Sequence, residues 1–166
     1  MKAFTDYSQI NWEAWVPTQR ATLLFVIRDG QILLIHKKRG LGAGKINGPG
    51  GRLEPGETPD AAAVREVQEE LCVTPTGLAA AGELRFQFAD GFSIQGYVFT
   101  ATDCRGTPQE TDEATPLWVR LDAIPFERMW ADDQGWMPLL LARRLFLGRF
   151  LFDGDTLLGH ELFLQP

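Results

Sequence analysis

Residues 47–71 read NGPGGRLEPGETPDAAAVREVQEEL, a glycine-rich stretch followed at once by a segment with helical periodicity. Thr58 and Pro59 predict where the helix begins, because threonine caps helix N-termini and proline suits the first helical position. Apolar residues then recur at helical spacing up to Leu71. The stretch therefore predicts a helix over residues 59–71 with one packing face and one charged face.

The charged face of this predicted helix carries three carboxylates, those of Glu66, Glu69 and Glu70. At roughly 100° per residue they fall on one side, where like charges raise one another's pKa unless a cation lies between them. Oxygen ligands of this kind suit Mg²⁺ or Mn²⁺. The alternative is a solvated acidic face on which Arg65 makes ordinary helix ion pairs. The preceding glycines favour the metal, because they let a backbone carbonyl approach the same cation.

The rest of the chain alternates between strand-like and helix-like patterns. Two strands near 20–28 and 31–37 flank the turn-forming pair Asp29 and Gly30. Further strands are predicted over 78–88, 92–101 and 116–121, with a long glycine-rich loop over 39–56 and a C-terminal hairpin within 149–162. A second helix is expected to begin at a cap formed by Asp132 or Asp133 and to continue to Phe146, with Arg143 and Arg144 complementing its dipole.

Composition limits the classes of function. The chain has 166 residues, 45% of them hydrophobic, and a net charge of −6. This length favours one domain, and the acidic balance does not suit a protein that binds nucleic-acid polymer, so bound phosphate is expected to need a metal. Cys72 and Cys104 show no disulfide or metal spacing, the start lacks a signal-peptide pattern, and no apolar run reaches membrane length. These features predict a cytoplasmic protein with no membrane partner.

One motif resembles a known family. Gly51, five residues, Glu57, seven residues and then REVQEELCV resembles the Nudix box, with eight of nine defined positions matched over 23 residues. The stretches KKRGLGAGKINGPGGRLEPGET, GTPQETDE and IPFERMWADDQGWMPLLL extend the resemblance to MutT-type members of that family over roughly residues 20–164. The resemblance implies an α/β (α+β) fold, an α/β/α sandwich around a mixed β-sheet. Residues 1–19 are then an N-terminal extension and residues 20–166 the Nudix hydrolase domain.

The resemblance also implies a metal and catalytic site. In Nudix enzymes of this type the box glutamates hold Mg²⁺, with Mn²⁺ as an alternative, and a backbone carbonyl completes that side of the site. The residues at these positions are Glu66, Glu69, Glu70 and the carbonyl of Gly50, with Glu113 in the TDE stretch as a further carboxylate. Glu69 or Glu70 is the expected base for the attacking water. Arg65 and Glu57 are expected to pair and orient the helix.

A base pocket is implied at a distance from the metal. Asn47 offers a donor and an acceptor to a purine edge, Trp130 a stacking face, and Asp132 and Asp133 two carboxyl groups that can share a proton. Lys37, Thr22 and Phe86 match further substrate-contacting positions. The ordinary alternatives are a helix cap for the aspartates, a core anchor for Trp130, a solvated strand-end lysine, and simple packing for Thr22 and Phe86.

Several positions depart from the family pattern. Cys72 stands where the box has glycine, which usually takes the left-handed conformation just after a helix. A cysteine there is expected either to cost about 1 kcal/mol or to end the helix differently. Four positions near the pocket, Leu41, Ile46, Gly135 and Met137, stand where aromatic residues are expected. These four replacements predict a roomier pocket with a looser base preference.

The function implied is a Mg²⁺-dependent nucleoside triphosphate pyrophosphohydrolase that cleaves oxidized purine nucleotides such as 8-oxo-dGTP and 2-hydroxy-dATP. Its products are a monophosphate and pyrophosphate, and it is expected to act as a monomer on a small-molecule nucleotide. One alternative is a Nudix hydrolase of ADP-ribose or dinucleoside polyphosphates, which the base-pocket residues disfavour. The other is a Nudix module that senses nucleotide without hydrolysing it, which the complete set of box glutamates disfavours.

Overall fold

A computed structural model describes residues 1–166, which form a mixed β-sheet with one helix on each face. Its helices are α1 (Pro59–Leu71) and α2 (Asp133–Leu141), and two short 3-10 turns are η1 (Tyr7–Gln9) and η2 (Phe126–Arg128). Its strands are β1 (Gln19–Arg28), β2 (Gln31–Lys37), β3 (Ile46–Asn47), β4 (Thr74–Thr76), β5 (Ala79–Phe88), β6 (Ser93–Ala101), β7 (Asp103–Arg105), β8 (Ala114–Arg120), β9 (Phe146–Asp153) and β10 (Thr156–Leu164). No helix is long and apolar enough to span a membrane.

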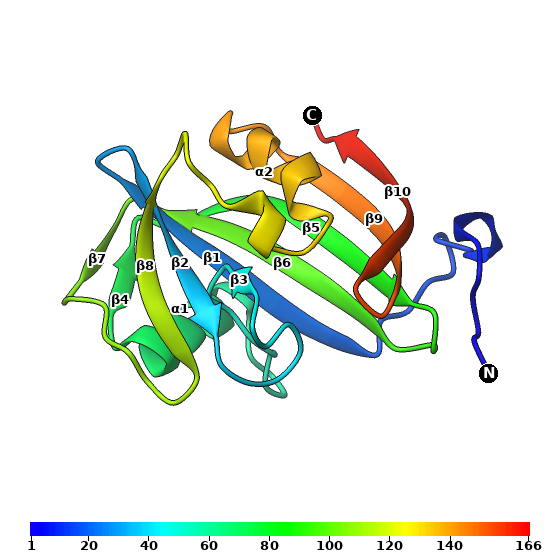
Figure 1. The fold of residues 1–166 in the computed structure, drawn as a ribbon. Helices are drawn as coiled ribbons and strands as arrows, with labels where there is room; N and C mark the ends of the chain where they lie inside the picture. The colour runs from blue at the N-terminus through cyan, green and yellow to red at the C-terminus, as the bar shows by residue number, and fades with distance from the viewer.

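The large sheet runs in the order β10-β9-β5-β6-β1-β2-β3, and β8 pairs with β2 (Figure 1). Its hairpins are antiparallel, but β1 lies parallel to β6 and β5 lies parallel to β9. The short strands β4 and β7 form a separate antiparallel pair. The predicted mixed sheet is therefore confirmed, and its parallel pairs bring together strands that are distant in the sequence.

Two hydrophobic clusters fill the layers on either side of the sheet (Figure 1). On one face α1 packs through Ala63, Val67 and Leu71 against apolar residues of β1 and β2. On the other face α2 packs against β5 and β9, where Trp136 and Phe146 are wholly buried. This arrangement confirms the predicted sandwich of two helices around a mixed sheet.

Helix α1 has the predicted bounds and cap. The Oγ1 of Thr58 accepts a hydrogen bond from the Ala61 N–H, and Pro59 is the first helical residue. The helix is capped at its C-terminus by Cys72, whose φ of 62° and ψ of 29° are left-handed. The cysteine thus takes the conformation that glycine usually takes at this position, and the helix does not end differently. Asp29 and Gly30 both have positive φ, which confirms the tight turn between β1 and β2.

Helix α2 is shorter than the sequence predicts. It ends at Leu141, because Arg143 takes a φ of 57° and Phe146 begins β9 in parallel register with Gly82 of β5. No basic residue lies in its last turn, so the prediction that Arg143 and Arg144 complement its dipole is wrong. Asp132 occupies the N-cap position, but its side chain makes no capping hydrogen bond.

The glycine-rich loop runs beside β1 rather than away from the sheet. The Thr22 N–H donates to the Gly51 carbonyl at 2.8 Å, and the Leu24 N–H donates to the Pro49 carbonyl at 2.9 Å. Within the loop, β3 pairs with β2. The loop is thereby held between β1 and α1, where the predicted metal ligands lie.

Candidate active site

A cavity of about 560 Å³ follows β1, with the glycine-rich loop and α1 at one end and residues 129–133 at the other. Every predicted site residue except Glu69 lines this cavity. These residues are Thr22, Lys37, Asn47, Gly50, Glu66, Glu70, Phe86, Glu113, Trp130, Asp132 and Asp133. The two groups of residues that the sequence assigns to metal and base therefore share one cavity.

Glu70 is the most enclosed carboxylate of α1, with 3% of its surface exposed. Its Oε1 accepts a 2.9 Å hydrogen bond from the Gly50 N–H. Burial, together with repulsion from Glu66 and Glu113, raises the pKa of Glu70 to about 8 despite that hydrogen bond. A bound cation would offset both effects, because it stabilises the ionised carboxylate.

Arg65 joins several of the neighbouring carboxylates. Its guanidinium donates to Glu57 at 2.8 and 2.9 Å, to Glu66 at 3.0 Å and to Glu69 at 3.3 Å. The predicted Arg65–Glu57 pair is thereby confirmed, and the hydrogen bonds from Arg65 lower the pKa of Glu57 to about 2. Arg65 also donates to the Arg52 carbonyl at 2.9 Å, which ties α1 to the loop.

The three box carboxylates are more dispersed than helical spacing predicts. Glu70 faces the loop, Glu66 is half-buried, and Glu69 is exposed toward Arg65. No three His, Cys, Asp or Glu side chains lie close enough together to form a ready-made metal site. The donor set is nevertheless suited to a hard divalent cation, since it consists of carboxylate oxygens, among them those of the buried Glu70. Binding would require Glu66 and Glu69 to exchange Arg65 for the cation.

Close approach at the loop explains why glycine occupies two positions there. A Cβ on Gly50 would lie 1.8 Å from the backbone oxygen of Thr22, a clash that no side-chain movement relieves. A Cβ on Gly51 would lie 2.3 Å from Cδ of Glu66, which can move. Gly50 therefore fixes the backbone path, whereas Gly51 leaves room for the carboxylate of Glu66.

Cationic side chains lie beside the acidic end of the cavity. The charge of Lys37 lowers the pKa of Glu70, although burial outweighs it. Arg39, which sequence reasoning missed, lines the same cavity and pairs with Glu113 at 3.1 Å. Arg52, which sequence reasoning also missed, lines the cavity next to Gly51. Such cations suit the phosphates of a ligand whose remaining charge is neutralised by a metal.

Two buried aspartates mark the other end of the cavity. Oδ2 of Asp132 accepts a 2.8 Å hydrogen bond from Nε1 of Trp136, while its buried Oδ1 has no partner. Burial raises the pKa of Asp132 to about 6. Burial and then repulsion from Asp132 raise the pKa of Asp133 well above its usual 3.8. Burial and mutual repulsion therefore both favour protonation in this pair, and a pair that holds one proton can both donate and accept.

Asn47 and Trp130 complete this end. Nδ2 of Asn47 donates to the carbonyls of Lys45 at 3.1 Å and Gly42 at 3.5 Å, which orients the amide. Trp130 packs edge-on against Phe152 with ring centroids 5.4 Å apart, and Nζ of Lys45 lies 5.3 Å from its ring centroid. The indole is thus held in place beside the aspartates.

Thr22 contributes a second buried polar atom without a partner, its Oγ1. An unsatisfied buried polar atom costs about 1–3 kcal/mol. Both this atom and Oδ1 of Asp132 belong to residues that line the cavity. A ligand that hydrogen-bonds to them would recover that cost.

Sequence reasoning missed much of the apolar lining. Phe88 could have been found, because it lies two residues after Phe86 and shares its strand face. Phe92 and Phe152 had no such signal, since only the β5–β6 turn and the β5–β9 pairing bring them to the cavity. The remaining apolar lining residues that were missed are Ala21, Leu23, Phe25, Ile35, Ile94 and Met129.

The prediction of a roomier pocket rests on fewer positions than the sequence suggests. Of the four replaced aromatics, only Leu41 lines the cavity. Ile46 and Met137 are buried in the core, and Gly135 is exposed on α2. Three of the four replacements therefore leave the cavity wall unchanged.

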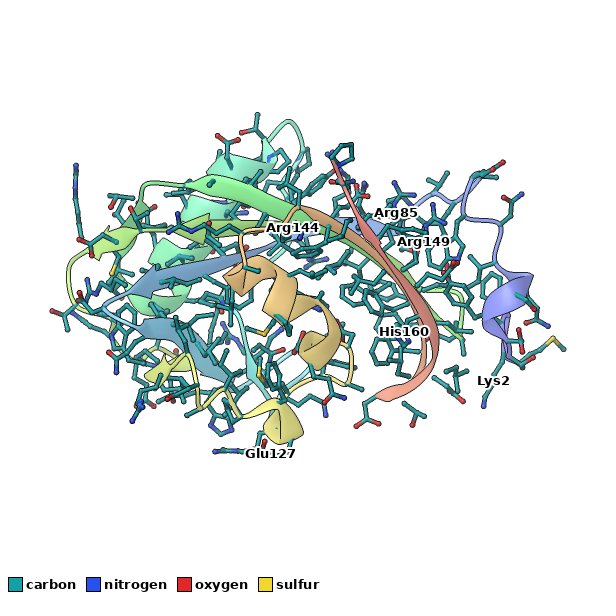
Figure 2. The ribbon with its side chains drawn as sticks, turned by 90° about the horizontal axis from the view of Figure 1, so that it is seen from above. Lys2, Arg85, Glu127, Arg144, Arg149 and His160 are labelled. Carbon is teal, nitrogen blue, oxygen red and sulfur yellow. The ribbon has the colours of Figure 1, made fainter.

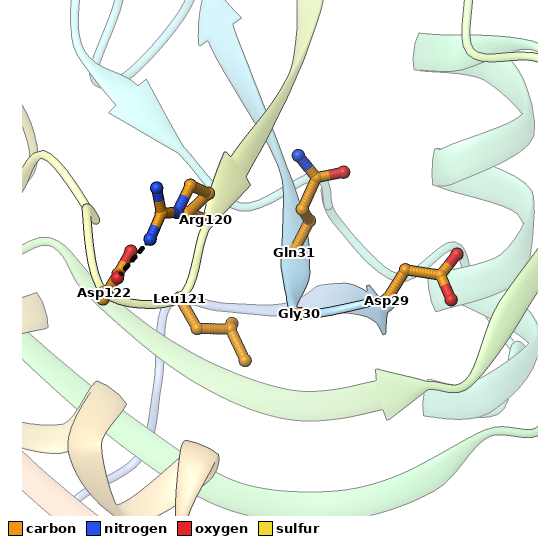
Figure 3. Close-up of a pocket in the computed structure, with 6 residues that line it drawn as sticks. All are labelled: Asp29, Gly30, Gln31, Arg120, Leu121 and Asp122. Carbon is orange, nitrogen blue, oxygen red and sulfur yellow. Dashed lines mark hydrogen bonds and ion pairs between the residues drawn. The ribbon is translucent and has the colours of Figure 1, made fainter.

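A second pocket, of about 510 Å³, lies at the β1–β2 turn and the end of β8 (Figure 3). It is shallow and lined by Asp29, Gly30, Gln31, Arg120, Leu121 and Asp122, with an exposed Arg120–Asp122 ion pair at 2.6 Å. None of the residues that line this pocket has a buried polar atom without a hydrogen-bond partner. The first cavity is therefore the candidate active site.

Comparison with known proteins agrees with this geometry. The model of the NUDIX domain matches residues 17–140. An oxidized purine nucleoside triphosphate hydrolase from Danio rerio is 44% identical over 143 residues, covering 85% of this chain and 92% of the relative, and the Mus musculus protein of that name is 41% identical with the same coverage. A MutT protein from Bacillus halodurans has a similar structure, with a TM-score of 0.78 and 28% identity over 87% of this chain and 97% of that chain.

Proposed function

Because the chain belongs to the Nudix family, we propose that it hydrolyses oxidized purine nucleoside triphosphates, such as 8-oxo-dGTP and 2-hydroxy-dATP, to the monophosphate and pyrophosphate. One observation carries the proposal. A single cavity joins the buried Glu70 and its neighbouring carboxylates at one end to two buried aspartates and an aromatic lining at the other. The chain is thus a Nudix hydrolase for which we propose a role in removing damaged nucleotides from the pool.

The acidic end of the cavity is proposed to carry the chemistry. When bound there, Mg²⁺ or Mn²⁺ would neutralise polyphosphate charge and lower the pKa of the attacking water. The residues proposed to hold the cation are Glu66, Glu69, Glu70, Glu113 and the carbonyl of Gly50. Glu69 or Glu70 would take the proton of the attacking water, and Lys37 would contact the phosphates.

The other end is proposed to recognise the base. An oxidized guanine and a 2-hydroxyadenine present different donor and acceptor patterns, and a fixed set of partners would leave unpaired polar groups against one of them. If Asp132 and Asp133 share one proton, its position can adapt to either base. Asn47 would add a further donor and acceptor, Thr22 a hydroxyl, and Trp130 and Phe86 apolar ring contacts.

The extent and assembly of the enzyme are also proposals. We assign the hydrolase domain to residues 20–166 and treat residues 1–19 as an extension that precedes it. We also propose that the enzyme acts as a monomer on a free nucleotide. Both cysteines are free thiols, which supports a reducing compartment such as the cytoplasm.

The test is a panel of nucleotides with product identification. The protein is incubated with Mg²⁺, Mn²⁺ or EDTA and with 8-oxo-dGTP, 2-hydroxy-dATP, dGTP, dATP, ADP-ribose or a dinucleoside polyphosphate. We expect the oxidized purines to have the highest kcat/KM, with release of pyrophosphate and loss of turnover in EDTA. A preference for ADP-ribose or the dinucleoside polyphosphate, or binding without turnover, would overturn the proposal.

The base-recognition step has its own variants. Asp132→Asn and Asp133→Asn should change the ratio of kcat/KM between 8-oxo-dGTP and 2-hydroxy-dATP, because each amide fixes a pattern that the acid leaves adjustable. Asp122→Asn, an exposed aspartate in the shallow pocket, is the matched control. Ratios that stay the same in both pocket variants would remove the aspartates from base recognition.

A further inference from the structure

Residues 1–16, which precede the family match, are folded against the sheet rather than free of it. Ile10 and Trp12 are buried with Leu151 of β9, and Phe4, Tyr7 and Trp15 pack around them. The hydroxyl of Tyr7 donates to Glu161 of β10 at 2.8 Å. The segment is therefore a strap across β5, β9 and β10.

Cation–aromatic contacts fasten the strap. The guanidinium of Arg149 lies 5.8 Å from the ring centroid of Trp12, and that of Arg85 lies 5.7 Å from the centroid of Trp15. Figure 2 shows Arg85 and Arg149 close to each other beside the sheet, with Lys2 at the far end of the strap. Lys2 pairs with Asp153, at the end of β9, at 2.5 Å.

A hydrogen-bond chain leads from the strap to the cavity. Nε1 of Trp15 donates a 2.9 Å bond to Oε1 of Gln87, a side chain only 4% exposed. Nε2 of Gln87 in turn donates to the carbonyls of Phe88 at 3.0 Å and Phe92 at 3.2 Å. Phe88 and Phe92 flank the β5–β6 turn, and both side chains line the base end of the cavity.

The same turn is held at a second point. The Ala3 N–H donates to the Ala89 carbonyl at 2.6 Å, and the Phe4 N–H donates to it at 3.2 Å. The Ala89 N–H donates to the carbonyl of Phe152, another residue that lines the cavity. The strap therefore hydrogen-bonds to the β5–β6 turn directly through Ala3 and Phe4 at one end, and through Trp15 and Gln87 at the other.

We propose that Trp15 and Gln87 are positioning residues for base recognition, which set the place of Phe88 and Phe92 from the face of the sheet opposite the cavity. The proposal rests on the proposed function and deepens it. Neither residue lines the cavity, so their effect is on binding of the base and not on bond cleavage.

The chain offers a matched pair of variants. Trp15→Phe keeps an aromatic ring but removes the N–H that Gln87 accepts. Trp12→Phe makes the same chemical change in the same strap, yet Nε1 of Trp12 has no hydrogen-bond partner. Gln87→Met removes the side-chain amide that links Trp15 to the β5–β6 turn. The Trp15→Phe, Gln87→Met double variant completes a double-mutant cycle.

The first readout needs no substrate. Amide hydrogen exchange in Phe88–Phe92 should be faster in Trp15→Phe than in wild type, while Trp12→Phe leaves it unchanged. In the Gln87→Met background, Trp15→Phe should have no further effect. Equal exchange in Trp15→Phe and Trp12→Phe would overturn the link between strap and turn.

The second readout is kinetic. Trp15→Phe should raise KM for 8-oxo-dGTP and weaken binding of the corresponding monophosphate by roughly two- to tenfold, the range for one lost hydrogen bond, with kcat retained. A two- to tenfold fall in kcat with KM unchanged would refute a positioning role. So would a change in KM in Trp12→Phe as large as that in Trp15→Phe. If wild type hydrolyses no oxidized nucleotide, the proposed function fails, while the exchange comparison still decides whether the strap holds the turn.

Discussion

Replacing Asp132 by Asn should stabilise the protein relative to wild type, and this gain should be larger at neutral pH than at acid pH. In the folded state burial raises the pKa of Asp132 from 3.8 to about 6, which corresponds to a cost of about 3 kcal/mol for ionising it. Because the folded pKa is the higher one, the stability that the protonated Asp132 contributes is fully present below about pH 4 and is lost as the pH rises through about 6, where the cost of ionisation appears. Asn carries no charge and does not pay this cost.

The measurement is the midpoint of thermal unfolding from pH 4 to pH 8 for wild type, Asp132→Asn and the exposed control Asp122→Asn. Taking the difference between variant and wild type cancels the titration of groups that do not interact with Asp132. For a chain of this size about 3 kcal/mol is roughly 6–12 °C in midpoint, an upper limit because Asp133 shares the proton. A difference between Asp132→Asn and wild type that does not change between pH 4 and pH 7 would refute the reasoning.

Three further predictions concern α1 and the glycine-rich loop before it. Glu70→Gln should abolish nearly all turnover while the protein stays folded, as EDTA should; turnover at the wild-type level in either case would exclude a metal-dependent mechanism. Gly51→Ala should lower kcat with little change in midpoint because it displaces Glu66, whereas Gly50→Ala should lower the midpoint itself; equal midpoints for the two would contradict the clash geometry. Cys72→Gly should raise the free energy of unfolding by up to about 1 kcal/mol with unchanged turnover, measured by urea titration; a large loss of turnover would assign the thiol a role.

Local signals predicted the parts of the fold that local physics decides. Thr58, Pro59 and the apolar stripe are enough to place α1, because a cap and a helical period act within a few residues. The turn at Asp29 and Gly30 likewise depends only on backbone conformations available to those two residues. Such elements could be bounded to within a residue or two from the sequence.

The parts that failed depend on partners far away in the chain. The apolar run after α2 has helical character, yet Phe146 joins β9 because it pairs with Gly82 and fills the core. The spacing of Glu66, Glu69 and Glu70 predicts a shared face but not that the Gly50 N–H draws one of them inward. These outcomes follow from packing that no local pattern encodes.

The candidate site divides in the same way. Its polar residues stand in motifs and could be named from the sequence, whereas the aromatic wall is assembled by strand pairing. The strap was invisible for a further reason, since its tryptophans read as ordinary apolar residues until Gln87 and Arg149 are placed beneath them.

The strap cannot make these contacts until β9 and β10 have been synthesised. Tyr7 meets Glu161 across 154 residues and Lys2 meets Asp153 across 151. At roughly 5–20 residues per second, a nascent chain would carry its unpaired tryptophans for several seconds before their partners leave the ribosome. Contacts this remote form late in refolding as well, so the amides of Ala3 and Phe4 should be among the last protected in pulse-labelling, and early protection would show that the segment folds on its own. The wall against which the base would rest is therefore completed only after β9 and β10 have been synthesised.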